Sequence, residues 1–128
     1  MLDTFEETYN DWELDIEGDV QTGFTFKEIE EQVSLIADGL IDFIVVTPPT
    51  PISVKGDNTE CTFVQICSDE VFDLVHFEIS ITNNGEEENI IYGKDRLVKE
   101  EALEILENFI KNKSIPSLKD WEICWIFE

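Results

Sequence analysis

Residues 71–92 read VFDLVHFEISITNNGEEENIIY, and the alternation in this stretch decides the fold. Every second position is apolar, at Val75, Phe77, Ile79 and Ile81, with His76, Glu78 and Ser80 between them. Such alternation is typical of a strand with one buried face, so we expect a strand over residues 71–82. Asn83-Asn84-Gly85 favours a turn, and residues 89–92 form a second apolar run. The stretch therefore predicts a β-hairpin.

Four further segments carry strand signals. Trp12, Leu14 and Ile16 alternate with acidic residues, which predicts a short strand at an edge of the sheet. Residues 41–47 and 62–67 are rich in β-branched and aromatic side chains, as buried strands are, and prolines follow the first of them. In residues 121–127 every second side chain is a large apolar one, which predicts a last strand.

Two segments have helical spacing. Residues 26–40 carry apolar side chains three and four apart, between a Thr25–Glu28 capping box and Gly39, where a helix can end. Residues 98–112 repeat the pattern. We therefore expect one α+β domain over residues 1–128. It is a mostly antiparallel sheet of about five to six strands that forms a sandwich with two main helices.

The charge points to a class of partner. Thirty acidic residues oppose eight Lys and Arg, which gives a net charge of −22, while 42% apolar residues argue for a folded core. A field of one sign attracts a cationic partner and speeds its association. Halophilic adaptation is the alternative, which the long aliphatic and aromatic runs do not favour. Direct binding to nucleic acid or to an anionic membrane is disfavoured, because phosphates would be repelled.

The cysteines and the N-terminus favour a cytoplasmic location. Cys61, Cys67 and Cys124 are odd in number and lack a CxxC spacing, which indicates reduced, buried thiols. We expect Cys61 and Cys67 to share one face of a strand, too far apart along it to form a disulfide. Residues 1–11 are acidic where a signal peptide needs bases, and no apolar run reaches the length of a membrane span.

The sequence gives little support to catalysis. His76 is the single histidine, in the middle of a predicted strand, and no nucleophile, phosphate-loop or dinucleotide motif occurs. Zinc would need clustered Cys and His, and these four residues are scattered along the chain. We expect no catalytic residue, metal or cofactor.

Three acidic clusters are the candidate partner-binding sites. Any one of them could be only a solvated face, but together they outnumber the interspersed bases. Trp12 belongs either to the core, which its alternation favours, or to an aromatic anchor within the acidic rim. The candidate residues are Asp11, Trp12, Glu13, Asp15 and Glu17, with Asp19 beside them, then Asp69, Glu70 and Asp73, and finally Glu86, Glu87 and Glu88.

A set of short motifs in roughly residues 60–125 has a familiar order. Thr62-Phe63-Val64-Gln65-Ile66 precedes Phe77-Glu78, then Lys99-Glu100-Glu101-Ala102 opens a helix, and Trp121-Glu122 follows. This order resembles the immunity proteins of bacterial polymorphic toxin systems, including those of contact-dependent growth inhibition. The resemblance implies structural roles for Gln65, Glu78 and Trp121, and no shared catalytic residues.

What the resemblance implies agrees with the charge. Immunity proteins are small, cytoplasmic and often acidic, and they bind the C-terminal toxin domain of their own system. We expect an immunity protein that neutralises a cognate cationic toxin domain, in particular a nuclease, by docking at or beside its active site. The alternative is a nucleic-acid mimic that inhibits a DNA-binding defence protein.

Overall fold

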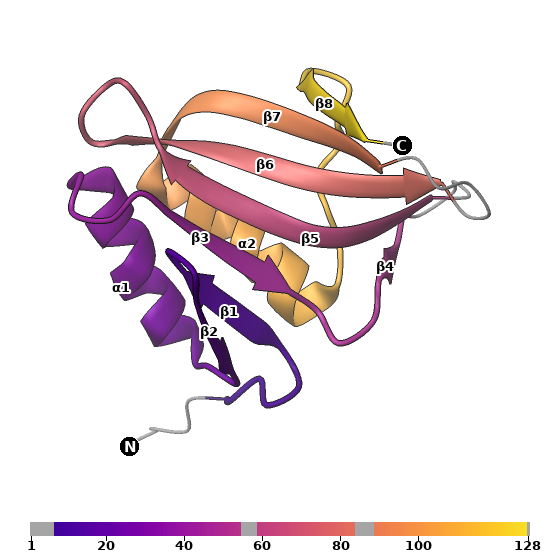
Figure 1. Ribbon diagram of the computed structural model, residues 1–128, viewed down its shortest axis with the longest axis horizontal. Helices are drawn as coiled ribbons and strands as arrows, with labels where there is room; N and C mark the ends of the chain where they lie inside the picture. Colours follow the sequence, from indigo (N-terminus) through magenta and orange to yellow (C-terminus); the bar gives the residue numbers. More distant parts are fainter. Residues whose placement is uncertain (1–6, 55–58, 84–88, 128) are drawn as a thin grey trace.

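The structure is a computed structural model, and it describes residues 7–54, 59–83 and 89–127. These residues form two helices and eight strands (Figure 1). In chain order they are β1 (Glu13–Ile16), β2 (Asp19–Thr22), α1 (Phe26–Ala37), β3 (Phe43–Thr47), β4 (Ile52–Ser53), β5 (Thr59–Ser68), β6 (Leu74–Asn83), β7 (Asn89–Val98), α2 (Lys99–Asn112) and β8 (Glu122–Phe127).

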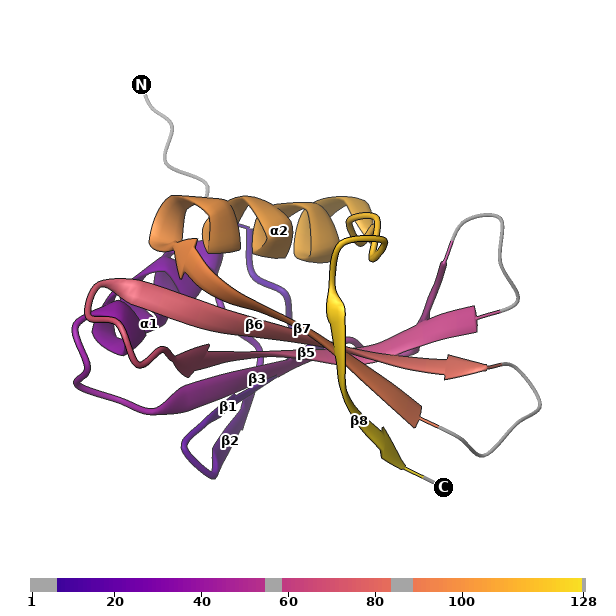
Figure 2. The same ribbon diagram turned by 90° about the horizontal axis from the view of Figure 1, so that it is seen from above.

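The strands form one antiparallel sheet in the order β2-β1-β3-β5-β6-β7-β8, and β4 pairs with β5 beside this path. Both helices lie on the same face of the sheet, as the view from above shows (Figure 2). We call the opposite face, which no helix covers, the open face. It is turned toward the viewer in Figure 1.

The core fills the space between the sheet and the helices. Buried side chains of α1 (Ile29, Val33 and Ile36) and of α2 (Leu106 and Phe109) share one cluster with the inward positions of the strands. Trp12 meets Phe109 edge to face, with ring centroids 5.5 Å apart. Each fully buried aliphatic or aromatic side chain contributes about 1.5–3 kcal/mol relative to exposure, so this layer dominates stability.

Local signals set the limits of the helices. Thr25 Oγ1 accepts a hydrogen bond from the Glu28 N–H, and the Glu28 carboxylate accepts one from the Thr25 N–H, so the capping box is confirmed. Gly39 follows α1 with φ 76°, a left-handed conformation that glycine adopts without strain. Helix α2 begins directly after β7 and ends at Lys113, which is also left-handed at φ 53°.

The α+β class and the antiparallel sheet are confirmed, but the predicted strand count was too low. The short strands β2 and β4 were missed, and β1 is not at the edge, because β2 pairs with its outer side. The predicted strand over residues 71–82 begins only at Leu74. Strand β7 continues past Tyr92 to Val98. The turn at Asn84-Gly85 lies outside the described residues.

The predicted pairing of Cys61 and Cys67 on one face of a strand is wrong. The register of β5 against β6 shifts between Cys61 and Phe63, so Thr62 is the extra residue of a β-bulge. The bulge reverses the alternation, which leaves Cys61 in the core and Cys67 on the open face. Within the described chain, neither helix is long and apolar enough to cross a membrane.

Candidate functional site

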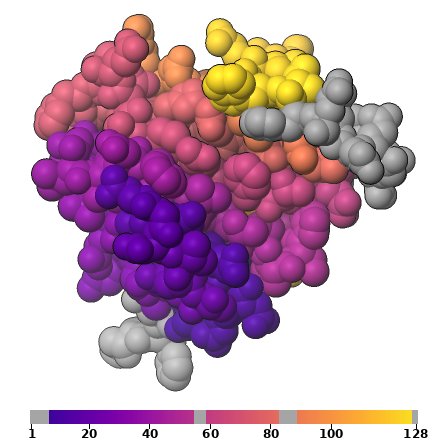
Figure 3. Space-filling model, viewed as in Figure 1, coloured from indigo at the N-terminus to yellow at the C-terminus, as the bar shows by residue number. Residues whose placement is uncertain are grey.

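The open face is the side of the sheet that Figure 3 shows, and neither helix covers it. In β1 the buried Leu14 alternates with Glu13 and Asp15, which places both carboxylates on the open face. The sheet register continues from Asp15 across the neighbouring strands. The partners in this row are Val45, Gln65, Glu78, Gly93 and Glu122.

Positive charge is unevenly distributed over the molecule. Strands β2, β1, β3, β5 and β6 are adjacent in the sheet and contain no Lys or Arg within their bounds. The bases of the described chain lie in α1, β7, α2 and the segment after α2. On the open face, these five strands therefore contribute carboxylates but no ammonium or guanidinium group.

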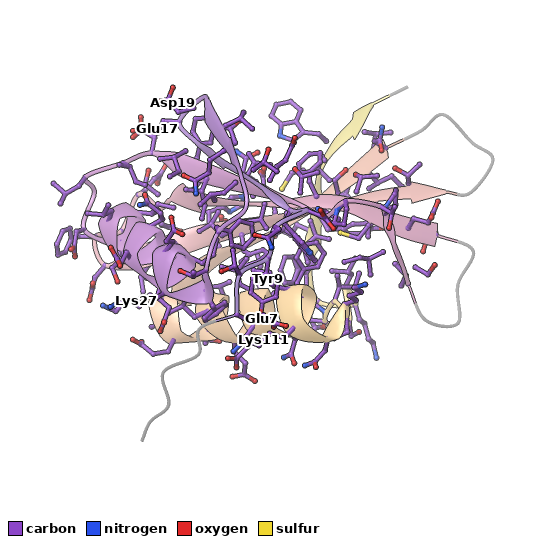
Figure 4. The ribbon with its side chains drawn as sticks, turned by 90° about the horizontal axis from the view of Figure 1, so that it is seen from below. Glu7, Tyr9, Glu17, Asp19, Lys27 and Lys111 are labelled. Atoms are coloured by element: carbon purple, nitrogen blue, oxygen red, sulfur yellow. The ribbon has the colours of Figure 1, made fainter. Side chains whose placement is uncertain are left out.

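The β1–β2 hairpin presents the first predicted acidic cluster. Asp15 Oδ1 accepts a hydrogen bond of 2.7 Å from the Gly18 N–H, and Glu17 Oε2 accepts one of 3.0 Å from the Asp42 N–H. Glu17 and Asp19 lie at the tip of the hairpin, on the side away from α2 and Lys111 (Figure 4). These carboxylates therefore shape the hairpin and also face solvent.

The loop between β5 and β6 presents the second cluster. Asp69 accepts hydrogen bonds from the Val71 N–H (3.0 Å) and the Arg96 N–H (2.9 Å). Burial raises the pKa of Asp69, but these two backbone donors and the charges of Arg96 and His76 together lower the pKa below its usual range. Glu70 and Asp73 are exposed. Asp69 thus ties the loop to β7, and the other two acids extend into solvent.

This loop also holds an apolar side chain that the sequence analysis missed. Phe72 is 74% exposed and stands between Glu70 and Asp73, with Val71 beside it at 42% exposure. It falls within the strand predicted for residues 71–82, but β6 begins only at Leu74. The aromatic residue in an acidic rim is therefore Phe72 and not Trp12. Trp12 is 5% exposed and packs against Phe24 and Phe109, which confirms its interpretation as core.

A hollow of about 350 Å³ joins this loop to β6 and β7. Its lining combines carboxylates with one imidazole and one guanidinium group. The residues are Ser68, Asp69, Glu70, His76, Asp95 and Arg96. Asp69 and Glu70 of the second acidic cluster therefore meet the single histidine at one end of the open face.

His76 contacts two carboxylates. Its Nε2 lies 3.0 Å from Glu78 Oε2, and its Nδ1 makes a short contact with Asp95 Oδ1. The hydrogen bond to Glu78 raises the pKa of His76, burial of the ring opposes this, and Asp95 adds to the rise. A bulge in β7 brings these groups together: Asp95 and Arg96 together oppose His76, and Arg96 has a left-handed φ of 59°.

Cys124 completes this group from the far strand. It is the extra residue of a bulge in β8, because Ile91 pairs with Trp125 while Tyr92 pairs with Ile123. One potential ligand atom each of His76, Glu78 and Cys124 lies within 4.8 Å of the others. His76 and Cys124 are far apart along the chain, but the sheet brings them together in space. Burial raises the pKa of the Cys124 thiol, and the Glu78, Asp95 and Glu122 carboxylates add to this.

The remaining predicted residues have different surroundings. Asp11 and Glu13 are exposed, and Glu86, Glu87 and Glu88 lie outside the described residues. Gln65 donates to Cys67 Sγ at 3.2 Å, and Trp121 packs against Phe77 in the core. Comparison of the chain with protein-family models, with curated proteins and with solved structures finds no match.

Proposed function

We propose that this chain is an immunity protein that binds a cognate cationic toxin domain through its open face and neutralises it. The observation that carries the proposal is the run of five adjacent strands without Lys or Arg. Even if every base of the chain paired with an acid, 22 carboxylates would remain without a basic partner. Such a surface favours a partner of opposite charge.

A nuclease domain is the basic partner that this surface fits best. Nucleases bind phosphates with clustered Lys and Arg, and carboxylates on the open face can occupy the same positions. The acids at the β1–β2 tip and around the β5–β6 loop lie at the same end of the strands (Figure 1), because Glu17 accepts from the Asp42 N–H and the Asp42 carbonyl accepts from the Ser68 N–H, next to Asp69. A partner that docks at this end would meet both groups of acids together, which favours one orientation and a faster approach.

Apolar side chains supply the contacts that hold the complex once it forms. Phe72 in the β5–β6 loop and Trp125 in β8 are 74% and 60% exposed. Aromatic residues surrounded by polar groups are frequent hot spots, and they act mainly on dissociation. In this proposal the acids steer the toxin domain and the two aromatic side chains anchor it. The chain itself performs no catalysis and acts in the cytoplasm.

The decisive experiment mixes the purified chain with the toxin domain encoded beside it and follows nuclease activity. We expect inhibition at a 1:1 ratio, with association that slows as salt increases, because exposed charges are screened. Full activity at excess inhibitor would refute the proposal. Inhibition of several unrelated DNA-binding proteins, with no preference for the neighbouring toxin, would instead support a nucleic-acid mimic.

A further inference from the structure

We propose that His76, Glu78 and Cys124 form a metal site on the open face that binds one divalent zinc ion. The three side chains come from β6 and β8 and meet across β7. This inference does not depend on the proposed toxin partner, because it follows from the donor atoms and their positions alone.

The donor set suits zinc. An imidazole nitrogen, a carboxylate oxygen and a thiolate sulfur are the three ligand types that zinc takes in proteins. Zinc bonds of about 2.0–2.3 Å in a tetrahedron place ligand atoms roughly 3.3–3.8 Å apart. The three atoms lie within 4.8 Å of one another, and Nε2 is 3.0 Å from the Glu78 oxygen, so side-chain shifts of about 1 Å suffice. Three protein ligands leave a fourth position for water.

The histidine is already oriented as zinc-binding histidines are. Its Nδ1 faces the Asp95 carboxylate, so Nδ1 can keep its proton while Nε2 binds the metal. A carboxylate behind a ligating histidine fixes the tautomer and the ring direction. Asp95 is therefore a positioning residue of the site and not a ligand. The nearby carboxylates of Asp95 and Glu122 also favour a cation over an uncharged ligand.

Gly93 makes room for the three ligands. It lies in β7 opposite Glu78 on one side and Glu122 on the other. A Cβ at this position would overlap Cys124 Sγ and would stand 3.0 Å from His76 Cε1 and 3.2 Å from His76 Nε2. The absent side chain therefore lets groups from β6 and β8 approach over the intervening strand, which no other residue type allows without displacement.

Cobalt(II) tests the site, because cobalt replaces zinc in tetrahedral sites and gives a thiolate charge-transfer band. The full chain, reduced with a phosphine and free of chelators, is titrated with Co²⁺ and then with Zn²⁺. We expect one equivalent of Co²⁺, the thiolate band, and its loss as Zn²⁺ displaces cobalt. Cys124→Ser should abolish the band, and Asp95→Asn should weaken binding by about 10–100-fold.

Two matched controls separate the site from general attraction to an acidic surface. Cys67→Ser removes the other thiol of the open face and should keep the band. Glu122→Gln removes one nearby negative charge, as Asp95→Asn does. If Glu122 contributes only to the general negative potential, the affinity for Co²⁺ should change by no more than about twofold. Circular dichroism establishes that each variant is folded. Absence of the thiolate band, or a band that survives Cys124→Ser, would overturn the assignment. Binding of several equivalents with equal affinity in all variants would also overturn it.

Discussion

Replacing Gly93 by alanine should destabilise the protein, although alanine normally strengthens a strand. Glycine inside a strand costs roughly 0.5–1 kcal/mol relative to alanine through backbone entropy, so an unobstructed site would gain about that much. At position 93 the new methyl group would overlap Cys124 Sγ and press on the His76 ring. The outcome therefore depends on whether the crowding outweighs the entropy.

The geometry indicates that crowding dominates. Adding a methyl group to a packed site costs typically 1–3 kcal/mol. The added Cβ would overlap Cys124 Sγ. It would also lie 3.0 Å and 3.2 Å from two atoms of the His76 ring, closer than ordinary van der Waals contact. After subtraction of the entropic gain, we expect a net destabilisation of about 1–2 kcal/mol. For a domain of this size that corresponds to a fall in melting temperature of roughly 4–8 °C.

Thermal and urea unfolding of four proteins measure the effect: the wild type, Gly93→Ala, Cys124→Ala and the double variant. Removal of the sulfur takes away the overlapped neighbour, so Cys124→Ala should restore much of the stability that Gly93→Ala loses. The double-mutant cycle should then give a coupling energy on the order of 1 kcal/mol. If Gly93→Ala is as stable as the wild type, or if the two changes are additive, the close approach of β6 and β8 over Gly93 is wrong.

Three further predictions concern other parts of the molecule. Thr25→Ala removes the cap of α1 and should cost about 1 kcal/mol in urea unfolding, whereas Thr25→Ser should be nearly neutral; equal losses would remove the capping box from the account. Asp69→Asn should cost roughly 1–2 kcal/mol at neutral pH, since the amide cannot accept from both the Val71 and Arg96 N–H groups. The lowered pKa of Asp69 means that its carboxylate stabilises the fold above the unfolded-state pKa, and this contribution disappears as pH falls through the folded-state pKa. The difference between wild type and variant should therefore shrink in acid, and a difference that grows in acid would contradict the assigned hydrogen bonds. Phe72→Ala should leave the melting temperature unchanged, because the side chain is 74% exposed, and should speed dissociation of the toxin complex by about tenfold or more in surface plasmon resonance; an unchanged dissociation rate would exclude Phe72 from the interface.

The main elements could be predicted because their signals are local. Alternation along β6 and the capping box of α1 each depend on residues within a few positions of one another. Strand β2 gives no such signal, because its sequence DVQT has no apolar alternation and its residues are largely exposed. It forms because the turn at Gly18, φ 101°, brings it beside β1. Strand β4 has two residues, too few for any pattern.

The cluster around His76 could not be predicted from the sequence. His76 and Cys124 meet because β7 lies between β6 and β8 and because bulges shift the register on both sides of β7. Register depends on contacts between distant segments, and a shift of one residue turns a side chain to the other face. The positive φ of Arg96 at one bulge also has no glycine to mark it in the sequence.

The sequence shows where the acidic residues lie along the chain, but it does not predict their hydrogen bonds or their exposure. Asp15, Glu17 and Asp69 each accept a backbone hydrogen bond, so part of the acidic surface stabilises turns as well as facing solvent. Composition alone cannot distinguish these carboxylates from exposed ones such as Glu70. The distinction matters for mutagenesis, because an amide replacement keeps one acceptor oxygen, which suffices at Asp15 and Glu17 but not at Asp69.

The measurement that most directly tests the central claim compares association rates of two charge-matched variants with the neighbouring toxin domain. One variant neutralises three acids of the open face and its hairpin tip, Glu13→Gln, Asp15→Asn and Glu17→Gln. The other neutralises three exposed acids of the helix layer, Glu30→Gln, Glu31→Gln and Glu104→Gln. Stopped-flow kinetics at low and high salt should show the first variant associating about tenfold more slowly at low salt, with a weaker salt dependence, while the second stays close to the wild type. Equal effects of the two variants would mean that net charge alone matters and that the open face does not bind the toxin.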